Sequence, residues 1–548
     1  MEKPTPISGL DIDIDSIADQ NTRIIVRHLL NIIEMQAAEI VKLKDENQKL
    51  RDEVNHLKGE QGKPTIRKQS KKGSDISSEA ERKKRNQAKA KRKKAKNKNK
   101  LTIHETQKCE IDKSQLPSDA VFKGFQSVIS QGIIIRPHNI QFDKEIYYSP
   151  SLKKTFIAQL PDGYAGDFSP SLKALVLDMH HHEKLTESAI LHFLTTHGIE
   201  IGKASISRIL TDNHEPFHQE KKDIVEAGLQ STDHQQIDDT SARVSGKNHY
   251  VHIICNDFYT AYFTRKDKTR LTIIDILTNG DMKFIFNESA YDLMLWMGIS
   301  NKMLDLLKAE KPNLLMNRDE IDAVLKKLMP NKAKQNTNRQ IILEASAIIA
   351  YQNRPDAIKI LLADDAPQFR QITELLALCW VHDGRHYKKL VPVVPLHRTI
   401  LDKFLTQYWD YYHQLLDYKK NPSDELLEKL NDQFDVLFST ETGYQQLDER
   451  IQKTKNKNDA LLLVLQYPTL PLHNNTSELG ARTQARYRDI SFHTINKKGT
   501  DAKDTFMTII QTAKKLGVNT YHYLLDRVSK KFQLPSLASQ VLVAKHSN

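Results

Sequence analysis

Three short stretches of the sequence carry acidic residues in positions suited to binding divalent cations. QQIDDTSARV (residues 235–244) and KILLADDAPQF (359–369) are apolar runs that lead into aspartate pairs, and HNNTSELGAR (473–482) places Glu478 near an expected helix start. Two Mg²⁺ ions about 3.5–4 Å apart can activate a nucleophile and stabilise the leaving oxygen in phosphodiester chemistry. Mg²⁺ prefers carboxylate oxygens as protein ligands, and Mn²⁺ can substitute for it. The stretches together predict a two-metal site acting on polynucleotides.

Each of these acids also has a simpler explanation. Aspartates are common where a strand ends in a turn, and a glutamate in a first helical turn stabilises the helix dipole. Neighbouring side chains on a strand point to opposite faces, so only one aspartate of each pair can face a common site. We select Asp238, Asp364 and Glu478 as the catalytic and metal-binding residues.

The order of the predicted elements suits a site built from these acids. The strand with Asp238 is followed by two further strands at 247–257 and 259–267 and by mainly helical sequence at 271–357. Next come the strand with Asp364, mainly helical sequence at 368–466 and the helix with Glu478. A ribonuclease-H-like sheet needs this order to gather three acids at one edge. We therefore predict an α/β catalytic domain of that type with large helical insertions.

Positive charge is concentrated in one block of the chain. The formal net charge is +12, and residues Arg82–Lys100 hold 12 Lys and Arg residues and no acid. Such a block binds phosphate backbones through counterion release, although a solvated linker or a localisation signal would have the same composition. The DNA contacts that we predict here are Arg82, Lys83, Lys84, Arg85, Arg92, Lys93 and Lys94.

A heptad pattern covers residues 21–58. One seam position holds Val26, Ile33, Ile40, Asn47 and Val54, and the other holds Leu29, Gln36, Leu43, Leu50 and Leu57. β-branched residues at the first position and leucines at the second favour a parallel two-stranded coiled coil, in which Asn47 fixes the register. The pattern predicts a homodimer; an amphipathic helix packed on its own chain is the alternative.

A helix-turn-helix is predicted within residues 171–211. A helix begins after Thr186, a turn follows at Gly198, and a second helix opens near Lys203–Ser205. Ser205 and Arg208 would then face the DNA groove or its phosphates. A plain helical hairpin packed on the catalytic core has the same pattern. The neighbouring histidines, His180–His182, lack further ligand spacing, so we interpret them as solvated.

The C-terminal motifs resemble DDE transposases of the insertion-sequence 66 type. The segment from His473 is similar to that family's paired asparagines (Asn474 and Asn475), glutamate and following arginine (Arg482). CWVHDGRHYKKL (379–390) resembles its Cys-Trp-x-His-x-x-Arg segment, and NKKGTDAKDTF and the residues after it resemble its terminal helix. IDDTSARV resembles its Asp-Glu-Thr strand, which is why Asp238 is preferred over Asp239. The similarity covers about residues 171–530.

The resemblance implies the fold, two Mg²⁺ ions, and double-stranded DNA, both transposon ends and target, as the substrate. It also implies that the two asparagines support the glutamate helix, and it allows accessory transposon-encoded proteins as partners. Three departures stand out: no cysteine-bearing zinc module follows the basic block, His473 replaces an acid, and Leu479 replaces a basic residue. The DNA contacts that we expect near the site are His382, Arg385, Arg482 and Arg488, where a structural histidine and a merely exposed basic face are the alternatives.

Several classes of protein are excluded by composition. The cysteines Cys109, Cys255 and Cys379 lie far apart, which supports neither a disulfide framework nor a thiolate zinc site. No apolar run is long enough for a membrane span, and the acidic N-terminus lacks a signal core. We therefore expect a cytoplasmic, nucleoid-associated protein.

We predict a DNA transposase that cleaves transposon ends and joins them to target DNA by two-metal-ion hydrolysis and transesterification. A catalytically decayed, transposase-derived DNA-binding or regulatory protein is the alternative, and a nuclease without strand joining also stays open. The predicted segments are 1–20 disordered, 21–58 coiled coil, 59–100 basic disordered tether, 101–170 small β-rich module, 171–230 helix-turn-helix-like segment, 231–500 catalytic domain and 501–548 C-terminal helical tail.

Overall fold

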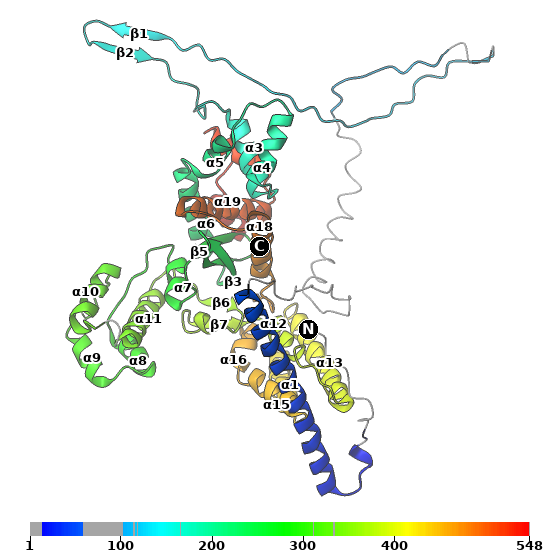
Figure 1. Cartoon of the computed structure of the whole chain (residues 1–548), viewed down its shortest axis with the longest axis vertical. Coiled ribbons are helices and arrows are strands. Elements are labelled where there is room, and N and C mark those ends of the chain that lie inside the picture. The colour runs from blue at the N-terminus through cyan, green and yellow to red at the C-terminus, as the bar shows by residue number, and fades with distance from the viewer. Residues whose placement is uncertain are drawn as a thin grey trace.

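A five-stranded mixed sheet lies at the centre of the chain, with helices around it (Figure 1). The structure is a computed structural model that describes residues 12, 14–58, 102–112, 116–117, 119–164, 166–310, 312–331 and 335–546. The predicted α/β class is confirmed at this level. Within the described residues, none of the helices is both long and apolar enough to cross a membrane.

The strand order of the sheet is β5-β4-β3-β6-β7. β3 (His234–Val244), β4 (Lys247–Cys255) and β5 (Thr260–Arg265) are antiparallel neighbours, as the three successive alternating runs predict. β6 (Ile360–Ala363) pairs in parallel with β3, and β7 (Leu375–Leu378) pairs in parallel with β6. The sequence prediction missed β7, because a four-residue apolar run has no periodicity that separates a buried strand from a helix.

The two faces of the sheet are covered by different helices. Ile237 and Ile254 belong to the main core, which they share with the helices before β3 and between β5 and β6. Ala242 and Ile253 face the opposite way, toward α18 (Asn475–Ser491). Gly480 of α18 lies so close that a Cβ there would be 2.7 Å from Cγ2 of Ile253. This glycine lets the helix lie directly on the strands.

α19 (Lys497–Leu516) runs along β5, at the edge of the sheet. Backbone N–H groups of alternate β5 residues donate to its side chains: Thr264 to Asp504 (2.6 Å), Tyr262 to Thr508 (3.1 Å) and Thr260 to Thr512 (3.3 Å). Four helical residues rise about 6 Å and two strand residues about 6.6 Å, so a polar side chain at every fourth position matches the strand. The expected boundary between residues 500 and 501 falls inside this helix, which is integral to the fold and not a tail.

Two helical insertions interrupt the sheet. The first lies between β5 and β6 and the second between β7 and α18; the second has its own aromatic core around the fully buried Trp380. The first comprises α7 (Arg270–Leu277), α8 (Glu288–Trp296), α9 (Asn301–Lys308), α10 (Arg318–Leu328) and α11 (Asn336–Gln352). The second comprises α12 (Trp380–Tyr387), α13 (Pro395–Tyr418), α14 (Asp424–Phe438), α15 (Gln445–Lys455), α16 (Asn458–Leu461) and α17 (Leu463–Gln466).

The predicted helix-turn-helix forms at the expected residues. The Thr186 side chain caps α4 (Glu187–Thr196), Gly198 takes a positive φ of 80°, and α5 (Lys203–Thr211) follows. Ile206 and Leu210 of α5 are buried, whereas Arg208 is exposed. α3 (Pro170–His181) contacts both helices of this pair, and α20 (Thr520–Val528) packs on α3. α21 (Leu537–His546) packs on α6 (Glu215–Leu229).

The N-terminal third departs from the predictions in two places. Ile14, in the stretch expected to be disordered, is 4 % exposed, and the short helix η1 (Ile14–Ser16) precedes α1 (Gln20–Leu57). The expected β-rich module has one antiparallel hairpin, β1 (Ile146–Ser149) with β2 (Lys154–Ile157), at the end of an extended arm (Figure 1). Within the described part of 102–164 no side chain is buried, so this arm has no core of its own. The basic tether at 59–100 lies outside the described residues.

Candidate metal centre

Asp238 lies in β3 on the face that α18 covers. It pairs in the sheet with Ile253, one of the residues beneath that helix. Burial raises the pKa of this carboxyl to about 7, and the negative charges of Asp364, Asp239 and Glu478 add to the rise. The Asp239 N–H, which donates to Asp238 Oδ1 (2.8 Å), opposes the shift only in part. Burial is the main cause of the raised pKa, and the added effect of Asp364 and Glu478 indicates that carboxylates from three distant segments lie near one another.

The other member of this pair, Asp239, has a different environment. Its side chain accepts hydrogen bonds from Lys268 Nζ (3.2 Å) and Gln368 Nε2 (3.1 Å). Lys268 also forms its ion pair. Strand alternation therefore sends the two acids of the pair to different partners. Asp238 is the member whose pKa is raised by the charges of Asp364 and Glu478.

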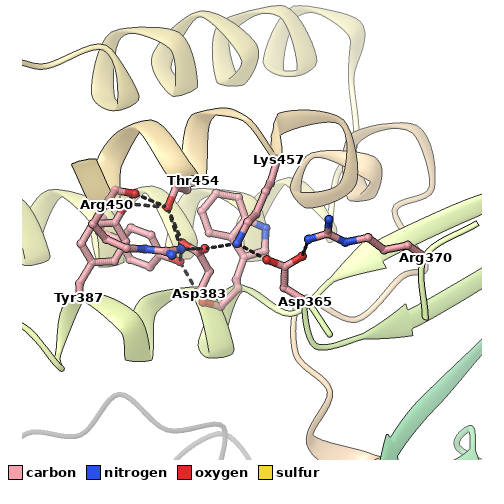
Figure 2. A network of polar contacts seen from close by, with 9 residues as sticks. Asp365, Arg370, Asp383, Tyr387, Arg450, Thr454 and Lys457 are labelled. Carbon is pink, nitrogen blue, oxygen red and sulfur yellow. Dashed lines mark hydrogen bonds and ion pairs between the residues drawn. The ribbon is translucent and has the colours of Figure 1, made fainter. Parts of the chain in front are cut away.

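The pair at the end of β6 divides in the same way. Asp364 accepts a hydrogen bond from the Ala366 N–H (3.1 Å) in its own loop. Asp365 instead forms ion pairs with Arg370 (2.7 Å) and Lys457 (2.5 Å). Lys457 also reaches Asp383 (3.8 Å), so Asp365 belongs to an ionic network between β6 and the second insertion (Figure 2). Within the described residues, no lysine or arginine forms an ion pair with Asp238 or Asp364.

The centre of that network is Asp383 of α12. It is 6 % exposed, and its carboxylate accepts hydrogen bonds from Arg450 and from Thr454 Oγ1 (2.8 Å), both in α15. The Tyr387 hydroxyl forms a hydrogen bond with Thr454 Oγ1 of α15 (2.7 Å) (Figure 2). The sequence prediction missed this cluster. Asp383 lies 67 positions before Arg450 and 71 before Thr454, and no local pattern connects the two helices.

Glu478 lies in the first turn of α18, as predicted. Its carboxylate accepts a hydrogen bond from Arg385 Nη2 (3.0 Å) and lies 3.6 Å from His382 Nε2. Burial lowers the pKa of His382, and the negative charge of Glu478 offsets part of this decrease. Two residues of the Cys-Trp-x-His-x-x-Arg segment therefore contact the third acid directly.

Asn474 connects the elements that carry the acids. This residue is fully buried, and its Nδ2 donates to the carbonyl oxygen of Ile237 (2.6 Å), immediately before Asp238. Its own carbonyl oxygen accepts the Glu478 N–H (3.1 Å). Its N–H donates to Sγ of Cys379 (3.2 Å), and the Cys379 N–H donates to the carbonyl oxygen of Ala363 (3.1 Å), the last residue of β6. A short series of hydrogen bonds thus sets β3, β6 and α18 relative to one another.

The donor atoms of the centre suit a hard divalent cation better than a soft one. Burial raises the pKa of the Cys379 thiol to about 11, so the sulfur is protonated at neutral pH. In the described chain two groups of three ligand atoms lie within 4.8 Å of one another, Cys379–His382–Glu478 and Asp178–His182–Glu183. The set Asp238, Asp364 and Glu478 is wider than this limit. Ions between these acids would be bridged by carboxylate oxygens, the ligands that Mg²⁺ prefers.

The predicted DNA contacts are found in several settings. Arg482 is exposed on α18, one turn after Glu478. Arg488 donates to the backbone oxygen (2.7 Å) and the hydroxyl (2.6 Å) of Ser241, so it ties α18 to β3. Arg208 donates to Ser205 (3.2 Å) on the surface of α5. The basic residues between Arg82 and Lys94 lie outside the described chain.

The histidine triple is not solvated as expected. His181 is 4 % exposed and stacks on Phe506 at 4.8 Å, and burial lowers its pKa far below the usual value. The His180 Nδ1 contacts the carbonyl oxygen of Leu185 (2.8 Å), and its other nitrogen contacts the Tyr487 hydroxyl. Two of these histidines therefore join α3 to α18 and α19.

Comparison with known proteins assigns no activity to this arrangement. No family model matches the chain. An uncharacterised protein of Sinorhizobium fredii, y4jO, is 28 % identical over 326 residues, which is 59 % of this chain and 100 % of that protein. Because that relative is itself uncharacterised, the case for function rests on the site.

Proposed function

We propose that this chain is a DDE-type DNA transposase whose catalytic acids are Asp238, Asp364 and Glu478. The observation that carries the proposal is the electrostatic one. Burial raises the pKa of Asp238 to about 7, with smaller contributions from the negative charges of Asp364, Asp239 and Glu478, and within the described residues no lysine or arginine forms an ion pair with Asp238. Strongly shifted carboxyls without a partner cation are typical of sites that bind one from outside.

The sheet supports the same function. Three antiparallel strands are followed by two strands parallel to the first, with the order β5-β4-β3-β6-β7. This is the arrangement expected of a ribonuclease-H-like domain, in which the first strand lies at the centre. Asp238 lies on that central strand, Asp364 follows its neighbour, and Glu478 comes from the helix over the same face.

The roles of the residues follow from their contacts. Asp238, Asp364 and Glu478 would hold two Mg²⁺ ions, which supply nucleophile activation and leaving-group stabilisation when bound. Asn474 keeps Glu478 and Asp238 in register through its bonds to both backbones. Arg385 neutralises the Glu478 carboxylate while no metal ion is bound to it. The Arg385 side chain is half exposed, so it can turn toward a DNA phosphate. Arg482 extends the positive surface along α18.

The substitution Glu478→Gln tests the proposal. We expect it to abolish Mg²⁺-dependent cleavage of DNA carrying the element's ends, because it removes one metal ligand and leaves the shape unchanged. Asp489→Asn, an exposed acid on the same helix, is the matched control and should retain cleavage. Joined products in the same assay separate a transposase from a nuclease. Equal cleavage by Glu478→Gln and the parent chain would contradict the assignment.

A second function deserves a separate test because Glu478 already has a cation partner. The Arg385 and His382 contacts would suit a silent core retained in a DNA-binding or regulatory protein. Such a protein would bind the same DNA with equal affinity with and without Mg²⁺ and would release no product. Cleavage by the parent chain rules this function out.

A further inference from the structure

A small pocket lies between the C-terminal end of α18, the end of β3 and the first half of α19. Arg243, Arg488 and Lys503 line it together with His493, and none of its lining residues is acidic. Arg243 and His493 are exposed, so the pocket can be reached from solvent. It is narrow, with room for about one water-sized group. Three cations without an acid around such a space attract an anion.

Lys503 is the buried cation of this pocket. It is 7 % exposed, and among the described residues its ammonium has neither a hydrogen-bond partner nor an ion pair. Burial lowers its pKa to about 8, with a further decrease from Arg488 and an opposing effect of Asp504. The Asp504 carboxylate is already bonded to the N–H and the hydroxyl of Thr264 (2.6 and 2.8 Å). Buried lysines are normally paired, so an anion in the pocket would stabilise this one.

Gln484 is a second buried polar group in the same lining. It is 1 % exposed, and its Oε1 has no hydrogen-bond partner within the described residues. A half-turn of the amide exchanges its oxygen and its NH₂ group, so either can face the pocket. With the NH₂ group inward, Gln484 would donate to an anion beside Lys503. An unbonded buried polar group is unfavourable, and such a ligand would remove that penalty.

The rim of the pocket is held by backbone contacts. The Thr494 N–H donates to the carbonyl oxygen of Arg243 (3.3 Å), and the Ser245 N–H donates to the carbonyl oxygen of Thr494 (2.8 Å). Between α18 and this bridge, Phe492 has a φ of 46°, which residues other than glycine rarely adopt. Strained backbone of this kind persists where the surroundings fix it, and it is common at ligand sites. The pocket is therefore formed before any ligand arrives.

The pocket and the candidate metal centre lie at two ends of the contact between α18 and β3. Ala242, in the pocket lining, follows Asp238 by four residues on the same face of β3, or about 13 Å. On α18, Arg482 and Arg486 follow Glu478 at steps of four residues, about 6 Å each, and both are exposed. A B-form strand advances about 3.4 Å per nucleotide, so 13 Å corresponds to about four nucleotides. A strand with one phosphate at the metal centre can thus reach the pocket with another.

We propose that Lys503, Gln484 and Arg243 bind one backbone phosphate of a DNA strand, about four nucleotides from the phosphate at the metal centre. The narrow pocket would take phosphate oxygens from a strand that lies across it, and not an entire nucleotide. The proposal rests on the proposed function for its ligand, DNA, and for the position of the strand. It does not depend on cleavage, so binding in a chelator tests it separately.

The salt dependence of DNA binding by the full chain tests the pocket. The affinity for a DNA duplex is measured in a chelator over a range of KCl concentrations. Lys503→Met keeps an apolar stem and removes the charge, so the slope of log K against log [KCl] should decrease in magnitude by about 0.9, the value for one phosphate. Lys326→Met, which changes an exposed lysine of α10, is the matched control and should keep the parent slope. An unchanged slope in Lys503→Met would overturn the proposal.

A second variant separates a lost contact from a damaged fold. Because Lys503 is buried without a partner, Lys503→Met should melt no lower than the parent chain. Arg243→Gln, at an exposed position, should reduce the slope in the same way. A lower melting temperature in Lys503→Met together with the parent slope in Arg243→Gln would overturn the proposal.

Calorimetry with inorganic phosphate distinguishes a strand phosphate from a free anion. Phosphate that binds saturably to the parent chain and not to Lys503→Met, while both have the same DNA slope, would assign the pocket to a free anion and overturn the proposal. Reduced slopes in Lys503→Met and Arg243→Gln would support it even if the parent chain cleaves no DNA. The pocket and the catalytic function can therefore fail independently.

Discussion

Two carboxylate clusters, each of which contains one member of the pair Asp364–Asp365, are built in opposite ways. Around Asp383 and Asp365, the carboxylates are matched by Arg450, Lys457 and Arg370 (Figure 2). Asp238 and Asp364 form no ion pair with a lysine or arginine within the described residues, and burial together with the neighbouring acids raises the pKa of Asp238 to about 7. The third acid of this cluster, Glu478, pairs with Arg385.

The difference distinguishes a cluster that the chain's own cations neutralise from one in which two aspartates have no such partner among the described residues. A neutralised cluster holds the second insertion against the sheet. In the acidic cluster only Glu478 has a cation partner, so its carboxylates are stabilised further when a divalent cation binds. Each aspartate pair contributes one acid to the acidic cluster and one to a structural contact.

The largest expected effect separates the two acids after β6. Asp364→Asn should lower Mg²⁺-dependent DNA cleavage by more than about 100-fold, since even residues behind metal ligands typically cost 10–100-fold. Asp365→Asn should cleave within about tenfold of the parent chain, because it loses ion pairs and no metal ligand. Cleavage rates under matched conditions decide. Similar losses in both variants would end the distinction between the clusters.

The structural cluster should show the largest effect on stability. Asp383→Ala leaves Arg450 without its buried partner, while Lys457 keeps Asp365, and should lower the free energy of unfolding by about 3–5 kcal/mol. Urea unfolding of this variant and of Asp402→Ala, which changes an exposed acid in α13, provides the measurement and its control. A loss no larger than the control's would mean that the network contributes little.

In the acidic cluster, the Asp238 carboxyl should make the metal-free protein less stable as the pH rises. With its pKa at about 7 in the folded chain and 3.8 ordinarily, Asp238 keeps its proton longer when folded. Its contribution to metal-free stability is complete below about pH 4 and is lost as the pH rises through about 7. Asp238→Asn should therefore be more stable than the parent chain at pH 8 and nearly equal at pH 4. Thermal melts in a chelator, repeated with Mg²⁺, would show whether metal removes the difference.

The smallest expected effect concerns neutral polar groups. Thr508→Val keeps the shape of α19 but removes the acceptor for the Tyr262 N–H, at a cost of about 1–3 kcal/mol. Thr406→Val on α13, whose hydroxyl bonds within its own helix, is the matched control. Equal stabilities in urea would show that the pairing of α19 with the edge strand is dispensable.

Much of the fold could be predicted because its signals are local. Alternating apolar residues located β3, β4 and β5 to within two residues, and Thr186 and Lys203 marked helix starts. β7 was missed because four apolar residues fit either a strand or a helix. The 102–164 arm was overestimated, since strand-like residues do not show whether a core exists to bury them.

The sequence could predict the acidic residues of the site, but it could not predict the contacts that hold them in place. Strand alternation requires one acid of each pair to turn away, but which cation meets Asp365 depends on Lys457, nearly 100 residues later. The bond between Asn474 and Ile237 spans 237 positions. The heptads predicted pairing, while the first half of α1 packs against Val393 and Val394, which no heptad pattern identifies.

Titration with Mn²⁺, followed by calorimetry at pH 7, tests the central claim that Asp238, Asp364 and Glu478 form a divalent cation site. The parent chain should bind saturably and release protons, because Asp238 must ionise to act as a ligand. Asp238→Asn should lose this binding, and Asp239→Asn should keep it. Binding that is equal in Asp238→Asn and the parent chain, or absent from both, would contradict the account.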